Sequence, residues 1–302
     1  MKNVIINRIL VLFFVCFLLP TKAVFSMDVQ IPFQKIKLNA NLEVAEGKTL
    51  SDGVFLMLHG TLAHGELEIL QSLQSILKEQ GQNSLSITLG LGISDRKGLY
   101  DCPTPHTHKH EDALDEIDAW IAWLKKEGAN RIYLLGHSRG GNQIAWHAAE
   151  RPDPVVPKVI LIAPMTWDKE RADKYYERAF KKDISPIIAN AEKLVSDGNP
   201  EAWMENVDFV YCRDTKAQAA SFVSYHGNEP RLNTAYHLPR INKPVLVFAG
   251  TEDSIVTNVI EEVEPLADEK KIKLVKIEGA DHFFRDLFAD DVAEHILNFI
   301  KP

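Results

Sequence analysis

One stretch near the middle of the chain, residues 132–147, restricts the possible fold most strongly. Strand-forming residues at 132–135 run into Gly136-His-Ser138-Arg-Gly140, and a helical sequence follows. A buried strand, a sharp turn that carries a serine, and a helix are the setting in which the pattern G-x-S-x-G positions a nucleophile. Small residues are needed on both sides of Ser138 because strand and helix nearly touch there, and Ser138 itself is expected to adopt strained backbone angles. Without this context, an ordinary strand-to-helix turn would be the simpler interpretation.

Three further motifs accompany this turn. A strand at 54–58 ends in His59-Gly60-Thr61, and a strand at 244–249 ends in Gly250-Thr-Glu-Asp253. A strand at 272–277 is followed by Gly279-Ala-Asp-His282. With these four motifs in this order, the chain resembles the α/β-hydrolase superfamily, in its serine hydrolase (esterase and lipase) branch, over roughly residues 53–300. The chain order Ser, Asp, His is that of this superfamily and differs from the orders in chymotrypsin and subtilisin.

The resemblance implies a catalytic triad. Ser138 would attack an acyl carbonyl, His282 would accept and return its proton, and Asp253 would orient the imidazole. Glu252 and Asp281 compete with Asp253 for the role of the acid, and the turn typical of the family favours Asp253.

The resemblance also implies an oxyanion hole made of backbone N–H groups. The N–H of Arg139, directly after the nucleophile, and that of Thr61 are the expected donors, with Leu62 as the reserve. The side chain of Arg139 is expected to pair with a neighbouring acid, and contact with an anionic substrate is the alternative. His59 and His137 are expected to act structurally, by packing and hydrogen-bonding the loops.

Strand and helix patterns alternate along the chain after one or two expected antiparallel edge strands within residues 28–50. This alternation predicts a mostly parallel central sheet with helices on both faces, which is the α/β-hydrolase fold. The pattern breaks at 166–239, a charged and aromatic stretch of helical character that is expected to form a mainly helical cap inserted after the sixth strand. The expected core is then 27–165 and 240–302. The cap aromatics are expected to contact substrate, and Leu62 and Trp167 are candidate substrate-binding residues.

His106, His108 and His110 alternate in one short segment that precedes a helix. Three imidazoles on one side of an extended segment fit zinc or copper. The interpretation we prefer is a polar loop that lies near the active site, because no fourth ligand is evident. Neither a metal nor another cofactor is therefore expected.

The first residues have the features of a secretory signal peptide. Lys2 and Arg8 precede an apolar run that is too short to span a bilayer, and small residues follow, with cleavage expected after Ala23 or Ser26. An uncleaved membrane anchor is the alternative. Loss of residues 1–26 removes three cations and no acid, which lowers the net charge from −8 to −11. This charge disfavours nucleic acid and anionic lipid. We therefore expect an exported protein, periplasmic or extracellular, without stable membrane insertion.

Two cysteines, Cys102 and Cys212, remain after removal of the signal peptide. In an oxidising compartment the two can form a disulfide between the loop before the long helix and the cap, and two free thiols are the alternative.

The complete Ser, Asp and His set predicts a serine hydrolase that cleaves a carboxylic ester (EC class 3.1), with a small-molecule acyl substrate and an acyl-enzyme intermediate. Amide, peptide and thioester bonds and acyl transfer to another alcohol are variants of the same chemistry. A non-catalytic protein of this fold that binds a ligand or partner is the alternative, since fold alone does not establish activity.

Overall fold

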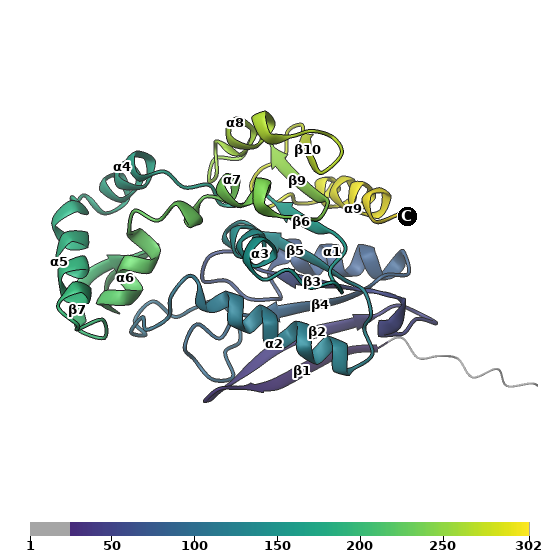
Figure 1. Ribbon diagram of the computed structural model, residues 1–302, viewed down its shortest axis with the longest axis horizontal. Coiled ribbons are helices and arrows are strands. Elements are labelled where there is room, and N and C mark those ends of the chain that lie inside the picture. The colour runs from purple at the N-terminus through teal and green to yellow at the C-terminus, as the bar shows by residue number, and fades with distance from the viewer. Residues whose placement is uncertain (1–24, 302) are drawn as a thin grey trace, which may run out of the picture.

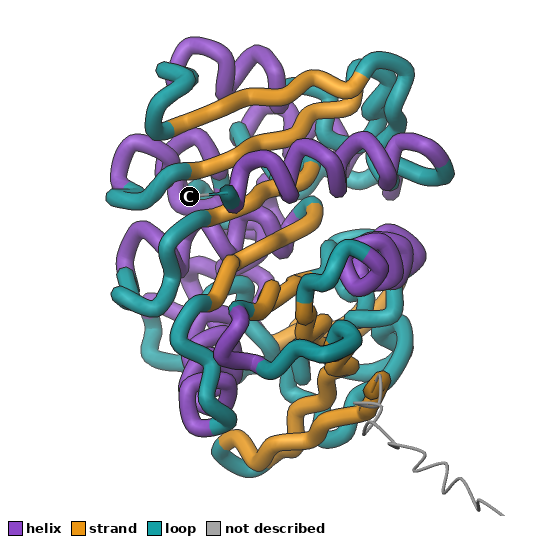
Figure 2. The backbone as a smooth tube through the Cα atoms, turned by 90° about the vertical axis from the view of Figure 1, so that its right-hand side faces the viewer, coloured by secondary structure: helices purple, strands orange, loops and turns teal. Residues whose placement is uncertain are grey.

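The computed structural model describes residues 25–301, so most of the predicted signal peptide lies outside the described residues. An eight-stranded sheet forms the centre of the molecule (Figures 1 and 2), in the order β1-β2-β4-β3-β5-β6-β9-β10. β1 and β2 form an antiparallel pair at one edge, β2 is antiparallel to β4, and all later neighbours in this order are parallel. The strands are β1 Phe25–Phe33, β2 Ile36–Val44, β3 Val54–Leu58, β4 Asn83–Thr88, β5 Ile132–His137, β6 Val159–Ile162, β9 Val245–Gly250 and β10 Ile272–Ile277.

Helices cover both faces of this sheet, and each face has its own apolar core. β3 is buried along its whole length, and its alternate residues point to opposite faces. Phe55 and Met57 belong to the core under α1 (Glu68–Glu79) and α9 (Leu287–Ile300). Val54, Leu56 and Leu58 belong to the core on the other face. The helices of that second face are α2 Asp112–Lys126, α3 Arg139–Glu150 and α8 Val259–Val263.

This topology explains why the four sequence motifs meet. β3, β5, β9 and β10 are parallel, so their carboxyl ends lie along one edge of the sheet. Each motif follows one of these strands. Ligands of open α/β sheets bind at this edge.

The chain leaves the sheet after β6 and returns to it at β9. Figure 1 shows the intervening segment, drawn in teal and green, to one side of the sheet. We call residues 166–239 the cap. Its elements are α4 Lys169–Phe180, α5 Ser185–Ser196, β7 Trp203–Phe209, β8 Cys212–Gln218, α6 Ala219–His226 and α7 Thr234–His237. The sequence indicated helices here, and the antiparallel β7–β8 hairpin was not expected.

A disulfide joins the cap to the body. Cys102 and Cys212 are bonded, with 5.2 Å between their Cα atoms, as the sequence analysis suggested for an oxidising compartment. Two hydrogen bonds extend this connection: the His106 N–H donates to the Lys216 carbonyl (2.7 Å), and the Gln218 N–H donates to the His106 carbonyl (2.9 Å). The segment 102–106 is therefore held against β8 by the disulfide at one end and by a single parallel bridge, between His106 and Ala217, at the other.

Candidate active site

Ser138 lies at the turn between β5 and α3 with φ 55° and ψ −122°, the strained conformation expected from the sequence. Its N–H donates to the Ile162 carbonyl on β6 (2.9 Å), and its carbonyl accepts from Gly141 and Met165 (both 2.9 Å). A Cβ at Gly136 would lie 2.4 Å from the Gly140 carbonyl oxygen, and one at Gly140 would lie 2.2 Å from the His59 carbonyl oxygen. Only glycine allows the strand and helix to approach in this way.

His282 and Asp253 are in contact. The distance between His282 Nδ1 and Asp253 Oδ2 is 2.7 Å, and both side chains are buried. The other carboxylate oxygen, Oδ1, accepts the N–H groups of Ile255 and Val256 (both 2.8 Å). Burial by itself would raise the pKa of Asp253, but the hydrogen bond and charge of His282 and these two N–H groups hold the pKa below its ordinary value. Asp253 is therefore a carboxylate at neutral pH.

The other two candidate acids lie elsewhere. Glu252 is exposed. The Asp281 carboxylate accepts the N–H of Phe283 (2.9 Å) and faces Arg285 at 3.6 Å. Of the three acids considered from the sequence, the structure thus brings only Asp253 to His282.

The residue before Ser138 connects the serine turn to the histidine loop. Nε2 of His137 lies 2.9 Å from the His282 carbonyl oxygen, and the two rings are 4.8 Å apart. Burial lowers the pKa of His137 to about 3, so the ring is neutral and its Nε2–H donates to that oxygen. His59 has a similar structural place, because its Nε2 accepts the Leu89 N–H (3.1 Å) while Nδ1 faces the Gly60 carbonyl (2.7 Å).

The backbone N–H groups of Thr61 and Arg139 donate to no other group within residues 25–301. Gly60 lies against Ser138, since a Cβ on Gly60 would be 3.1 Å from Ser138 Cβ and 3.5 Å from its Oγ. The loop that carries Thr61 therefore passes directly beside the serine. Leu62, the reserve donor, is buried in a left-handed conformation with φ 50°, and its carbonyl accepts the Tyr100 N–H (2.9 Å).

The expectation that the Arg139 side chain pairs with an acid is wrong. Nε donates to Thr61 Oγ1 (3.0 Å), Nη1 donates to His110 Nδ1 (3.1 Å), and the guanidinium lies over the Tyr225 ring with Cζ 4.9 Å from its centroid. No Asp or Glu in the described part of the chain forms an ion pair with it. The nucleophile turn points this side chain toward the loop of Thr61 and the cap, and the sequence around Arg139 offers no acid between Glu127 and Glu150.

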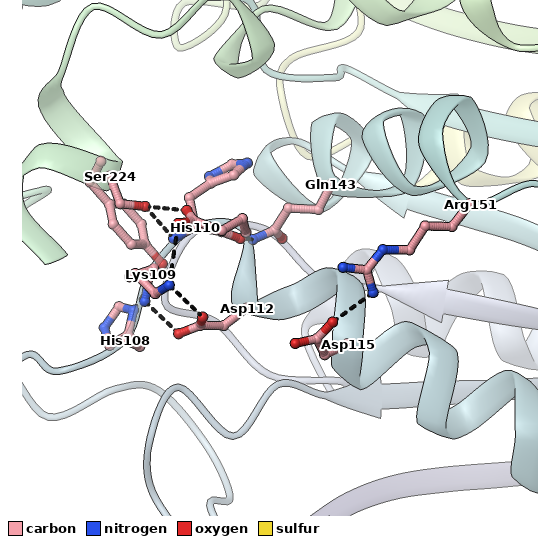
Figure 3. Close-up of polar contacts among 10 residues, drawn as sticks. His108, Lys109, His110, Asp112, Asp115, Gln143, Arg151 and Ser224 are labelled. Atoms are coloured by element: carbon pink, nitrogen blue, oxygen red, sulfur yellow. Dashed lines mark hydrogen bonds and ion pairs between the residues drawn. The ribbon is translucent and has the colours of Figure 1, made fainter. Parts of the chain in front are cut away.

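Backbone and side-chain contacts hold His110 at this place (Figure 3). Its N–H donates to Ser224 Oγ of the cap (2.7 Å), and its carbonyl accepts from Gln143 Nε2 (2.9 Å). Its Nε2 lies 2.8 Å from Asn142 Oδ1. Burial lowers the pKa of His110 well below its ordinary value, so the ring is neutral at pH 7.

The three histidines of the 106–110 segment do not converge. Nδ1 of His106 faces Nε2 of His108 (3.2 Å), and Nδ1 of His108 faces the Tyr225 hydroxyl (2.9 Å). His110 instead contacts Asn142. Within the described residues, no group of three or more His, Cys, Asp or Glu side chains is arranged to hold a metal ion. The segment 106–110 is instead a buried polar segment that lies between the body and the cap.

Half of the ten aromatic residues of the cap pack against one another. The buried cluster inside the cap contains Tyr176, Phe180, Phe209, Phe222 and Tyr225, so these rings serve the core of the cap itself. Tyr225 also reaches Arg139. Trp167 is partly buried just after the segment that hydrogen-bonds Ser138.

A cleft of about 610 Å³ opens between α2, α3 and the cap helices α5 and α6. Its lining includes Trp146, Glu192 and Ser224, but none of Ser138, Asp253 or His282. The geometry of the triad residues, and not this cleft, therefore identifies the candidate site.

Sequence reasoning placed His110 in a polar loop near the active site, which its contact with Arg139 bears out, but it missed Asn142 and Tyr225 as neighbours of the serine turn. A polar residue on the otherwise buried face of α3 was a usable signal for Asn142. Tyr225 had none, because it lies far along the chain in the cap and reaches the turn only through the tertiary fold.

Comparisons with known proteins agree with this fold. The family model described as "Alpha/beta hydrolase family" matches residues 55–295. A bifunctional esterase/perhydrolase of Acinetobacter calcoaceticus is 24% identical over 210 residues, which are 64% of this chain and 75% of that protein. A (lyso)-N-acylphosphatidylethanolamine lipase of Bos taurus is 25% identical over 244 residues, 70% of this chain and 68% of that protein.

Among solved structures, Est1E from Butyrivibrio proteoclasticus is similar with a TM-score of 0.64 at 22% identity, covering 90% of this chain and 98% of that chain. The family model covers most of the chain, and the strands it spans carry all four motifs. The chain is therefore a member of the α/β-hydrolase family, in its esterase and lipase branch.

Proposed function

We propose that the protein is an exported serine hydrolase that cleaves a carboxylic ester through Ser138, His282 and Asp253. The observation that carries this proposal is the combination at one sheet edge of a serine in a strained turn and a buried imidazole bonded to a carboxylate. The esterase and lipase relatives support ester substrates.

In this mechanism Ser138 Oγ attacks the ester carbonyl carbon while His282 Nε2 takes its proton. Asp253 fixes the tautomer by accepting the Nδ1–H, which leaves the Nε2 lone pair for the serine. The tetrahedral oxyanion accepts hydrogen bonds from the backbone N–H groups of Thr61 and Arg139. His282 then protonates the leaving alcohol, which departs and leaves the acyl-enzyme. A water, activated by the same imidazole, releases the acid.

Each part depends on a separate structural support. The helix N-terminus behind Ser138 favours the developing negative charge. His137 holds the backbone of His282, and two N–H groups hold Asp253. A residue in strained φ/ψ angles at such a place costs about 1–3 kcal/mol and persists only where the surrounding structure imposes it.

The test is labelling with a neutral fluorophosphonate probe, together with turnover of a series of esters of increasing acyl length. The wild-type protein should be labelled at Ser138 and should release alcohol and acid. Ser138→Ala should lose labelling and several orders of magnitude of turnover with an unchanged melting temperature. Labelling of Ser138→Ala at the wild-type rate would exclude this serine as the nucleophile.

Export has its own test. The apolar run after Arg8 supports removal of a signal peptide. No helix within residues 25–301 is long and apolar enough to cross a membrane. The intact mass of the protein recovered from the producing cell should correspond to a chain that begins after Ala23 or Ser26. Recovery of the full-length mass would contradict export by this route.

A further inference from the structure

The guanidinium of Arg139 has more hydrogen-bonding capacity than the protein uses. Arginine carries five N–H donors and remains charged in proteins. Thr61 Oγ1 and His110 Nδ1 accept one each. The other three have no acceptor within the described residues, and the Tyr225 ring covers only a face of the group. Burial lowers the pKa of Arg139, and among residues 25–301 Tyr225 is the one titratable neighbour that counteracts this.

A second buried arginine shows how this protein satisfies a structural guanidinium. Arg96 donates to the carbonyl oxygens of Leu89 (2.6 Å), Gly98 (2.7 Å) and Ala63 (2.6 Å). The charge of Glu116 also favours its protonated form. Arg139 has neither a carbonyl acceptor nor a carboxylate neighbour. Arg139 is only partly buried, and none of its nitrogens is among the buried side-chain atoms that lack a partner, so its three remaining N–H donors stay accessible to a bound anion.

The orientation of the Arg139 fork is fixed by a chain of hydrogen bonds from the cap. Asn142 Nδ2 donates to the Arg231 carbonyl (3.1 Å), so Asn142 Oδ1 faces His110 and accepts its Nε2–H. Since the neutral His110 ring has its proton on Nε2, Nδ1 is the acceptor for Arg139 Nη1. The guanidinium is thus held in one position without neutralisation of its charge.

This position is beside the reacting centre. Arg139 directly follows Ser138, and its Nε is bonded to Thr61, whose own N–H is a proposed oxyanion donor. Gly60, one residue earlier, lies so near Ser138 that a Cβ on it would be 3.1 Å from Ser138 Cβ. The unused donors therefore belong to a side chain of the turn that carries Ser138, which is hydrogen-bonded to the loop that carries Thr61.

We infer that Arg139 binds a carboxylate of the substrate close to the scissile ester, so that the preferred substrates are anionic esters. This inference rests on the proposed function. A carboxylate matches the planar fork of a guanidinium, which can donate two parallel hydrogen bonds to it. Because the group is already oriented, little conformational entropy is lost on binding. The carboxylate belongs either to the acyl part or to the leaving alcohol, and both sources present the same chemistry to Arg139.

The experiment compares esters in matched pairs. For the acyl side, the pair is the mono-para-nitrophenyl ester of adipic acid and its methyl-capped form. For the leaving-group side, the pair is meta-acetoxybenzoate and its methyl ester. The readout is the ratio of kcat/KM for the anionic ester to that for its neutral partner, near neutral pH. A ratio cancels a general loss of activity in a variant.

We expect the wild-type protein to favour the anionic member of one pair by about 10- to 100-fold, the range of a charge-assisted hydrogen bond. Arg139→Gln should bring that ratio to about one. Arg139→Lys should keep part of it, because the charge remains but the fork is lost. Arg171→Gln is the matched control: it removes a guanidinium of cap helix α4 that is already paired with Glu261 at 3.0 Å, so it should leave the ratio unchanged.

The pair that responds identifies the side of the ester that carries the carboxylate. A ratio near or below one for both pairs in the wild-type protein overturns the inference, as does a ratio that Arg139→Gln leaves intact. Both of these outcomes leave the proposed hydrolase standing if a neutral fluorophosphonate still labels Ser138. A wild-type protein that is not labelled would instead reject the proposed function.

Discussion

The Asp253→Asn substitution is a sharp test of the proposed triad because the structure dictates how the new amide must lie. Oδ1 of Asp253 accepts two backbone N–H groups, from Ile255 and Val256 (both 2.8 Å), and Oδ2 accepts from His282 (2.7 Å). An asparagine has only one oxygen, which can accept either from the two backbone N–H groups or from His282. The two backbone N–H groups outnumber the single N–H of the imidazole. The amide oxygen should therefore keep the Oδ1 position, with its NH₂ group directed at the imidazole.

This orientation imposes the wrong tautomer on His282. An NH₂ group next to Nδ1 requires a lone pair on Nδ1, so the ring proton moves to Nε2 and His282 can no longer accept the proton of Ser138. Rotation of the amide to restore the active tautomer would leave two buried N–H groups without acceptors. At about 1–3 kcal/mol each, this costs about 2–6 kcal/mol, which is roughly 30- to 20,000-fold in rate. The corresponding change in a serine protease triad costs about 10⁴.

The assay is kcat/KM for a small neutral ester, with the melting temperature to verify that the variant is folded. The ¹⁵N chemical shifts of His282 should show the proton on Nδ1 in the wild-type protein and on Nε2 in Asp253→Asn. The isosteric Glu252→Gln change is the control and should have no effect, because Glu252 is exposed. An Asp253→Asn enzyme within about threefold of wild type, or an equal loss from Glu252→Gln, would refute this reasoning.

Two further predictions concern stability. Removal of the Cys102–Cys212 disulfide by a double change to alanine opens a loop with a sequence separation of 110. Because the unfolded chain gains the entropy of the open loop, the double variant should have a free energy of unfolding lower by up to about 4.8 kcal/mol, measured by urea titration. Alkylation of both cysteines in the unreduced exported protein would contradict the bond itself. His106 is the second case: burial lowers its pKa to about 4, against about 6.5 when unfolded, so the unfolded chain binds the extra proton and stability falls as pH drops between these values. His106→Phe should therefore reduce the stability lost between pH 7 and pH 5 by about 2 kcal/mol, and an unchanged pH dependence would show that another group titrates.

The sequence was sufficient to predict the elements that place the triad residues, because each motif directly follows a buried strand of strong β character. Parallel strands bring their carboxyl ends to one edge, so the placement of Ser138, Asp253 and His282 at that edge follows from local patterns and topology alone. The catalytic roles of these residues stay predictions.

The β7–β8 hairpin was not predictable in the same way. Its pairing shifts register between Met204 and Val207 and again between Val207 and Phe209. Each irregularity moves the next apolar residue out of the two-residue period by which a strand is identified. β8 also carries charged residues at exposed positions, which weakens its apolar pattern further.

The partners of Arg139 could not be predicted because they come from three parts of the chain that only the tertiary fold brings together. Thr61 belongs to the loop after β3, His110 to the segment before α2, and Tyr225 to the cap. The same segment that carries His110 is bonded to β8 by the disulfide and the backbone hydrogen bonds of His106. A displacement of the cap from the body must therefore break these bonds or move His110, and with it the acceptor that orients Arg139. The attachment of residues 102–110 to β8 therefore both connects the cap to the body and holds the guanidinium of Arg139 in its position beside Ser138.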